Sequence, residues 1–196
     1  MHSLTAWNPM GWVLVVGTAL GLASAASAEE VLIDFEQVPI RLDPQNDELV
    51  NRLERYEEKG VAFKLAREPE RSKARGRIMF FPHLGSGRKG LLNAMASEQQ
   101  LPVQVRFSQG ASAVTIVFWA SSGASAKLEA FNRRGEVVAR DELKIVPGRK
   151  RPEDAIPTFT LKVAADEISH VEFSGPRTGE FLAADEVRFT PLAAAP

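Results

Sequence analysis

The feature that most constrains this chain is a strict alternation of apolar and polar residues in short runs between residues 31 and 189. Successive side chains of a β-strand point to opposite faces, so this period predicts strands with one buried and one exposed face. The apolar positions of the runs are Val31, Ile33 and Phe35; Val61, Phe63 and Leu65; Val103, Val105 and Phe107; Phe159, Leu161 and Val163; Val171 and Phe173; Val187 and Phe189. The pattern predicts an all-β, antiparallel protein.

One run, residues 114–120, is apolar on both faces, which is typical of a central strand covered on both sides. Turn residues separate the runs, as at Gln109-Gly110. The segment Asn132-Arg133-Arg134-Gly135 between two alternating runs predicts a hairpin. Regular short strands with such turns predict a two-sheet antiparallel β-sandwich.

One segment, residues 44–59, carries a helical pattern instead. Asp43 is a suitable N-cap and Pro44 suits the first helical position. Apolar residues then recur at helical spacing, and Gly60 follows as a stop. The members of this stripe are Leu49, Val50, Leu53 and Tyr56. We therefore expect one short helix that packs across an end or edge of the sandwich.

The first 28 residues resemble a signal peptide. An apolar stretch at residues 11–22 precedes Ala26-Ser27-Ala28, which matches the A-x-A cleavage pattern, although no Lys or Arg precedes the stretch. An uncleaved anchor is the alternative, but a spanning helix needs about 20 apolar residues. We expect a secreted or periplasmic protein without a membrane span after cleavage, with one β-sandwich domain at residues 29–192 and a disordered tail at residues 193–196.

Composition excludes several classes of protein. The chain has 196 residues, of which 44% are hydrophobic, enough for one sizeable core. Its formal net charge of -1 gives no field that favours nucleic acid. It has no cysteine, which excludes disulfides, thiolate metal sites and thiol nucleophiles.

The order of several short motifs resembles that of a known group of exported proteins. The motifs are Ile33-Asp34-Phe35-Glu36, Gly60-Val61-Ala62-Phe63, Leu92-Asn93, the apolar run 114–118, the 128–135 hairpin, and Ala184-Asp185-Glu186-Val187-Arg188-Phe189. Residues 31–190 thus resemble the galactose-binding-like jelly-roll ectodomains of exported bacterial proteins, including those with a C-terminal sorting tag. This chain lacks the tag after Phe189, so the resemblance does not imply membrane sorting.

The resemblance also implies a structural metal site. In calcium-binding members of such jelly rolls, acidic groups of the first and last strands meet, which here places Asp34 and Glu36 near Asp185 or Glu186. Calcium takes carboxylate and carbonyl oxygens, so such a site is chemically reasonable. The alternative is that these residues simply face solvent. No other cofactor is expected.

Several motifs suggest chemistry but have simpler explanations. Residues 85–90 match G-x-G-x-x-G, yet no βαβ unit surrounds them, so nucleotide binding is not expected. Neither a G-x-S-x-G nor an H-E-x-x-H motif is present. His83 and His170 show no metal-ligand spacing. The basic residues of 67–77 and 149–151, with Arg88 and Lys89, could form an anion-binding rim, but interleaved acidic residues largely cancel the charge of the two loops.

Trp119 is the candidate ligand-binding residue, because sugar-binding faces stack aromatic rings on saccharides. The alternative is a core position in the most apolar strand. The leading hypothesis is a non-catalytic exported module that binds a glycan or an envelope protein partner. A structural or assembly protein of the envelope is the alternative, and a polysaccharide hydrolase or lyase ranks last. A glycosidase is recognised by the placement of its two catalytic carboxyl groups in space, which the sequence does not give.

Overall fold

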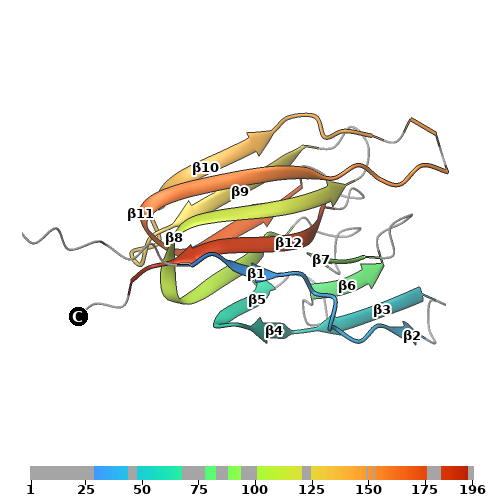
Figure 1. The fold of residues 1–196 in the computed structure, drawn as a ribbon, viewed down its shortest axis with the longest axis horizontal. Helices are drawn as coiled ribbons and strands as arrows, with labels where there is room; N and C mark the ends of the chain where they lie inside the picture. The colour runs from blue at the N-terminus through green and yellow to red at the C-terminus, as the bar shows by residue number, and fades with distance from the viewer. Residues whose placement is uncertain are drawn as a thin grey trace, which may run out of the picture.

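A computed structural model describes residues 29–43, 48–67, 78–82, 88–93, 101–120, 125–148, 150–151, 153–175 and 182–193. These residues form twelve strands, all paired antiparallel, and contain no helix (Figure 1). The strands are β1 (Val31–Ile33), β2 (Arg41–Asp43), β3 (Glu48–Leu53), β4 (Arg55–Glu58), β5 (Val61–Leu65), β6 (Ile78–Pro82), β7 (Lys89–Asn93), β8 (Val103–Ala120), β9 (Ala126–Phe131), β10 (Val137–Leu143), β11 (Phe159–Ser174) and β12 (Leu182–Pro191). The all-β prediction is confirmed.

The strands form one large sheet in the order β10-β9-β11-β8-β12-β7-β6-β3-β2. Three further strands lie off this path: β1 pairs with β12, β5 pairs with β8, and β4 pairs with β5. The long strands β8 and β11 pair with each other along their length, but the two halves of β8 have different second neighbours. Residues 103–107 pair with β5, and residues 111–120 pair with β12.

The change of neighbour occurs at Gly110, which has a φ of 80°. The β8/β11 register also shifts here, between Ile168 and His170 opposite Gly110 and between Ala164 and Ile168 just beyond it. The turn predicted at Gln109-Gly110 is therefore wrong as a chain reversal. Glycine takes a positive φ without a steric penalty, and such a bulge bends a strand that continues in the same ladder.

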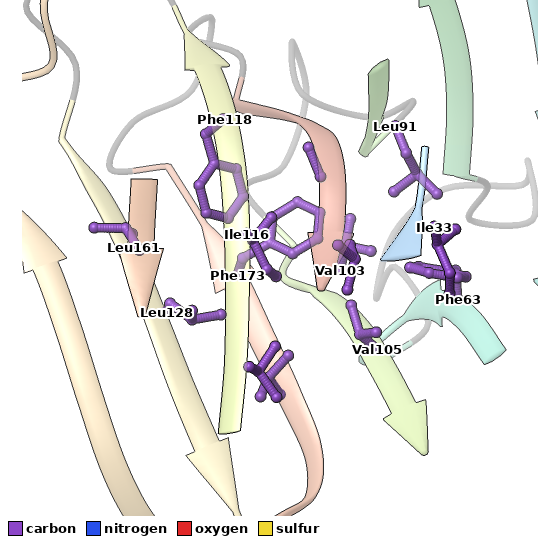
Figure 2. Close-up of a cluster of buried hydrophobic side chains, with 14 of the residues drawn as sticks. Ile33, Phe63, Leu91, Val103, Val105, Ile116, Phe118, Leu128, Leu161 and Phe173 are labelled. Carbon is purple, nitrogen blue, oxygen red and sulfur yellow. The ribbon is translucent and has the colours of Figure 1, made fainter. Parts of the chain in front are cut away.

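The sheet folds over on itself at this bend. Phe118 pairs with Phe159 and Phe173 pairs with Val103, so a straight ladder would separate Phe118 from Phe173 by about 50 Å. Their ring centroids instead lie 5.2 Å apart, within the cluster that Figure 2 shows. The two packed layers are thus connected parts of one sheet that share β8 and β11.

The core lies between these layers. The apolar positions of the alternating runs are buried in one cluster, with Val31 and Phe159 packed against its margin. Phe35, just after β1, is fully buried and meets Tyr56, Phe63 and Phe80 edge-on or tilted. Its φ of 59° is unusual for a bulky residue. Burial of its ring therefore holds the backbone in a strained conformation.

The helix predicted at residues 44–59 is wrong. Residues 48–58 form β3 and β4 instead, while residues 44–47 lie outside the described ranges. Lys59 and Gly60 have φ values of 48° and 75° and link β4 to β5 in a two-residue hairpin that pairs Tyr56 with Phe63. Positive φ at both central residues is the requirement of a type I′ turn. The apolar stripe follows helical spacing, but pairing with β2, β5 and β6 decides the structure.

The predicted hairpin at residues 132–135 is confirmed. Asn132 Oδ1 accepts hydrogen bonds from the backbone N–H of Arg134 (2.9 Å) and Glu136 (3.1 Å), and Gly135 has a φ of 78°. The predicted signal peptide at residues 1–28 lies outside the described ranges, as do residues 194–196 of the predicted tail. Across the described part, no helix has the length and hydropathy needed to cross a membrane.

Candidate functional site

Trp119, the predicted ligand-binding residue, lies in the interior. Its side chain has no exposed surface and packs in a small second cluster with Leu92, Ile156 and Ala183. A Cβ atom added to Gly90 would lie 2.8 Å from the indole Nε1, so the backbone of β7 covers the ring closely. A saccharide therefore cannot stack on Trp119 in this arrangement.

The predicted metal-ligating residues lie along one edge of β12, where its pairing partner changes from β7 to β1. β7 pairs at Ala184, β1 pairs at residues 187–189, and the β12 register shifts between Ala184 and Glu186. Asp185 is 1% exposed and forms an ion pair with Arg88 (Nη1 to Oδ2, 3.2 Å). Arg88 also pairs with Glu186. We name Arg88, Asp185, Glu186, Arg188 and Glu36 the seam cluster.

Cationic side chains contact the carboxylates of the seam cluster. Arg188 binds Glu186 at 2.8 Å. Although burial opposes the effect, hydrogen bonds from Arg188 and Arg88 lower the pKa of the Glu186 carboxyl below its ordinary value. Two positive charges beside one carboxylate favour its ionised form. Arginine side chains therefore neutralise the Glu186 carboxylate of the seam cluster.

Glu36 joins the seam cluster through Lys89. The Lys89 backbone N–H donates to Glu36 Oε1 (3.1 Å), and Lys89 Nζ donates to the Glu36 carbonyl oxygen. Asp34 Oδ1 instead accepts from the Glu36 backbone N–H at 3.2 Å. Within the described ranges, no three His, Cys, Asp or Glu side chains are grouped to hold a metal ion. Calcium at Asp34, Glu36 and Asp185 stays a prediction.

A pocket of about 250 Å³ opens where the β4–β5 turn, the β8 bend and the end of β12 meet. Its apolar lining comes from Val31, Phe107, Phe189 and Pro191. The Phe107 and Phe189 ring centroids lie 5.0 Å apart, and each residue is about 95% buried. The pocket therefore has an aromatic wall that belongs to the main core.

Polar groups line the rest of the pocket: Lys59, Ser108 and Gln109. Lys59 is held in place, since its Nζ donates to the Leu32 carbonyl oxygen (2.7 Å) and pairs with Glu58 (3.3 Å). Gly60 keeps this side narrow, because a Cβ there would lie 2.8 Å from Ser108 Oγ. The result is a small pocket with an apolar wall on one side and polar residues on the other, a mixture that small-ligand sites also have.

A second polar surface lies on the solvent side of β5, β8, β11 and β9. The register aligns one row through Lys64, Gln104, Glu172 and Glu129 and another through Ala62, Arg106, His170 and Phe131. We name these two rows the polar face. Gln104 Nε2 donates to Glu172 Oε1 at 3.3 Å, and His170 stacks on Phe131 with ring centroids 4.8 Å apart and an interplanar angle of 1°.

His170 is a buried titratable group of the polar face. Burial, together with the nearby charges of Arg106 and Lys64, lowers the pKa of its imidazole below the ordinary value of 6.5. Its Nδ1 has no hydrogen-bond partner in the described part of the chain. Its Nε2 lies 3.8 Å from Glu172 Oε1, beyond hydrogen-bond distance. The His170 imidazole is therefore a neutral ring that lies between Arg106 and Phe131 in the row.

Several predicted motifs fall outside the described ranges. These are His83, residues 85–87 of the glycine-rich motif, residues 68–77 of the first basic loop, and Arg149 of the second. Arg88 and Lys89 are described, and both contact carboxylates of the seam cluster.

The sequence alone predicts neither the pocket nor the polar face. The alternation places Gln104, Arg106, His170 and Glu172 on solvent-facing positions, but only the register shows that they are neighbours. The sequence features that point to the pocket are weaker: Gly60 and Gly110, which were predicted to be a helix stop and a turn, line it. Their positive φ values instead shape its walls.

Comparison with known proteins gives no family. No family model matches the chain, and no curated protein matches it in sequence. Among solved structures it is similar to the arabinose-bound α-L-arabinofuranosidase MgGH51 (TM-score 0.43, 10% identity, 83% of this chain), of which it spans only 26%. It is also similar to an adhesin domain of Lys-gingipain from Porphyromonas gingivalis (TM-score 0.39, 10% identity, 85% of this chain and 100% of that chain).

The similar structures include carbohydrate-binding modules. One is the CBM22-1 xylan-binding domain of Paenibacillus barcinonensis Xyn10C, with a TM-score of 0.37, 9% identity and coverage of 87% of this chain and 100% of that chain. Similarity at this level assigns no ligand and no family to this chain. The resemblance to galactose-binding-like ectodomains stays a prediction.

Proposed function

We propose that this protein is a non-catalytic binding module whose pocket holds a single saccharide unit of a glycan. The observation that carries the proposal is the composition of the pocket: Phe107 and Phe189 on one side, Ser108, Gln109 and Lys59 on the other. A sugar ring has an apolar face and a rim of hydroxyl groups, which match these two sides. The volume of about 250 Å³ suits one ring rather than a chain.

The pocket supports binding rather than hydrolysis. Glycoside hydrolysis ordinarily needs two carboxyl groups that flank the scissile bond. None of the described residues that line the pocket is an Asp, a Glu or a His. Lys59, the one titratable side chain among the described lining residues, is held by Leu32 and Glu58.

We extend the proposal to the setting of the module. The A-x-A pattern at Ala26-Ser27-Ala28 supports export to the periplasm or the medium, where glycans are abundant ligands. The folded-over antiparallel sheet supports a jelly-roll sandwich. Both assignments are open to direct tests: N-terminal sequencing of the mature protein and an experimental structure.

The test is a glycan array followed by titration of the strongest neutral saccharide. Gln109→Trp fills the pocket from an exposed position, and Gln109→Ala leaves it open as the matched control. We expect Gln109→Trp to abolish binding, and Gln109→Ala to weaken it by about two- to tenfold, the value of one hydrogen bond. Binding that survives Gln109→Trp, or an array without a neutral ligand, overturns the proposal.

A further inference from the structure

The polar face carries two cations that no carboxylate of the described residues neutralises. Lys64 and Arg106 are exposed on neighbouring strands, and neither forms an ion pair with any described residue. Arg55, Lys59, Arg88, Arg140 and Arg188 each pair with an acidic residue. Lys64 and Arg106 share the lack of an ion pair within the described residues with other exposed cations such as Lys144 and Lys162, and they differ from those in lying on neighbouring strands of the polar face. The two cations lie on adjacent cross-strand pairs, Lys64 with Gln104 and Arg106 with Ala62.

The groups around the two cations define what a ligand would meet. Glu57 lies beyond Ala62 in the row of Arg106, but it is paired with Arg55. Glu172 lies beyond Gln104 in the row of Lys64 and accepts a hydrogen bond from Gln104. Arg106 is directly opposite His170, which is 92% buried and has an unpartnered Nδ1. Positive charge at the surface and a buried ring nitrogen without a partner in the described residues therefore belong to one cross-strand pair.

Phe131 extends this place sideways. It is partly exposed, stacks on His170 and lies two strands from Arg106, about 10 Å by the spacing of paired strands. A flat apolar ring beside cations offers a sugar ring a stacking surface next to a carboxylate site. A ligand that reaches both is longer than one sugar unit.

We propose that the polar face is a second, separate site that binds an acidic oligosaccharide, with a uronate carboxylate on Lys64 and Arg106 and a neighbouring sugar ring on Phe131. Arginine and lysine form strong charge-assisted hydrogen bonds with anionic oxygens such as those of a carboxylate. Nucleic acid is the less fitting polyanion, because two cations neutralise few phosphates and Glu172 and Glu129 continue the row.

The experiment titrates the full mature protein with oligogalacturonate at low salt and with a neutral galacto-oligosaccharide of equal length. Lys64→Gln/Arg106→Gln removes the two cations. Lys144→Gln/Lys162→Gln removes the same charge from exposed positions off the polar face and is the matched control. We expect the first variant to lose at least about tenfold in oligogalacturonate affinity and the control to stay within about twofold.

Three results overturn the inference: no oligogalacturonate binding by the wild type, equal losses in the two double variants, or equal binding of a duplex DNA of the same charge. Phe131→Ala is expected to weaken oligogalacturonate binding without changing its salt dependence. Gln109→Trp separates the two sites, because it is expected to abolish neutral saccharide binding while oligogalacturonate binding persists. Each site therefore fails or stands independently of the other.

Discussion

The backbone of Gly90 lies against the indole of Trp119 so closely that a Cβ at Gly90 would be 2.8 Å from Nε1 and 2.9 Å from Cζ2. Trp119 is fully buried and holds the second cluster together. The contact explains why the largest aromatic residue of the β8 run is not available to a ligand.

We expect Gly90→Ala to destabilise the protein by about 1–3 kcal/mol, because the added methyl group overpacks a filled site. Chemical denaturation measures this loss. Trp119→Phe in the Gly90→Ala background is expected to recover part of it, because the smaller ring leaves room. A Gly90→Ala protein as stable as the wild type would show that the indole can move freely.

Phe35 predicts an unusual order of stabilities. Loss of its buried ring costs about 3–5 kcal/mol in Phe35→Ala. Glycine is normally worse than alanine, but at a φ of 59° it relieves the strained backbone. We therefore expect Phe35→Gly to be no less stable than Phe35→Ala in urea unfolding. If Phe35→Gly is clearly the less stable of the two, residue 35 is not held in the left-handed region.

His170 predicts a loss of stability in mild acid. Its folded pKa is lowered below 6.5, so the unfolded chain binds the proton more strongly. The stability that the neutral His170 contributes is fully present above about pH 6.5 and is lost as the pH falls toward the folded pKa. Unfolding free energies between pH 7.5 and 5 should fall more steeply for the wild type than for His170→Gln. Parallel curves would contradict the lowered pKa.

Arg88 predicts a stability cost that tests the seam cluster. Arg88→Met removes a cation from buried Asp185 and from Glu186, and we expect a loss of about 2 kcal/mol, since Arg88 is 42% exposed and partly screened by water. Arg88→Lys should recover only part of it, because lysine lacks the planar fork. Full recovery with lysine would show that charge alone matters.

The seam cluster also predicts the outcome of metal removal. Arg88 contacts Asp185, and Lys89 contacts Glu36, so calcium would have to compete with them. We expect the melting temperature to be the same with calcium and with a chelator. An ion bound only to the folded state would raise it by mass action, so a shift that disappears in Asp185→Asn would establish the site.

The alternation predicted the strands well because burial on one face fixes the side-chain period. The pattern failed at residues 48–58, where Leu49, Val50, Leu53 and Tyr56 follow helical spacing rather than a period of two, and only long-range pairing with β2, β5 and β6 makes the segment two strands. It also failed at Gly110, because a glycine with positive φ serves a turn and a bulge equally. The candidate sites depend on register, which local pattern does not specify.

The pairing of β1 with β12 has a consequence for how the chain reaches its native state. β12 is the sole described strand partner of β1, and almost the entire described chain separates the two. Because loop closure of this length must precede the pairing, we expect β1 to be among the last strands to dock. Ile33 would then stay exposed until synthesis reaches the final strand, which makes the unfinished chain prone to aggregate.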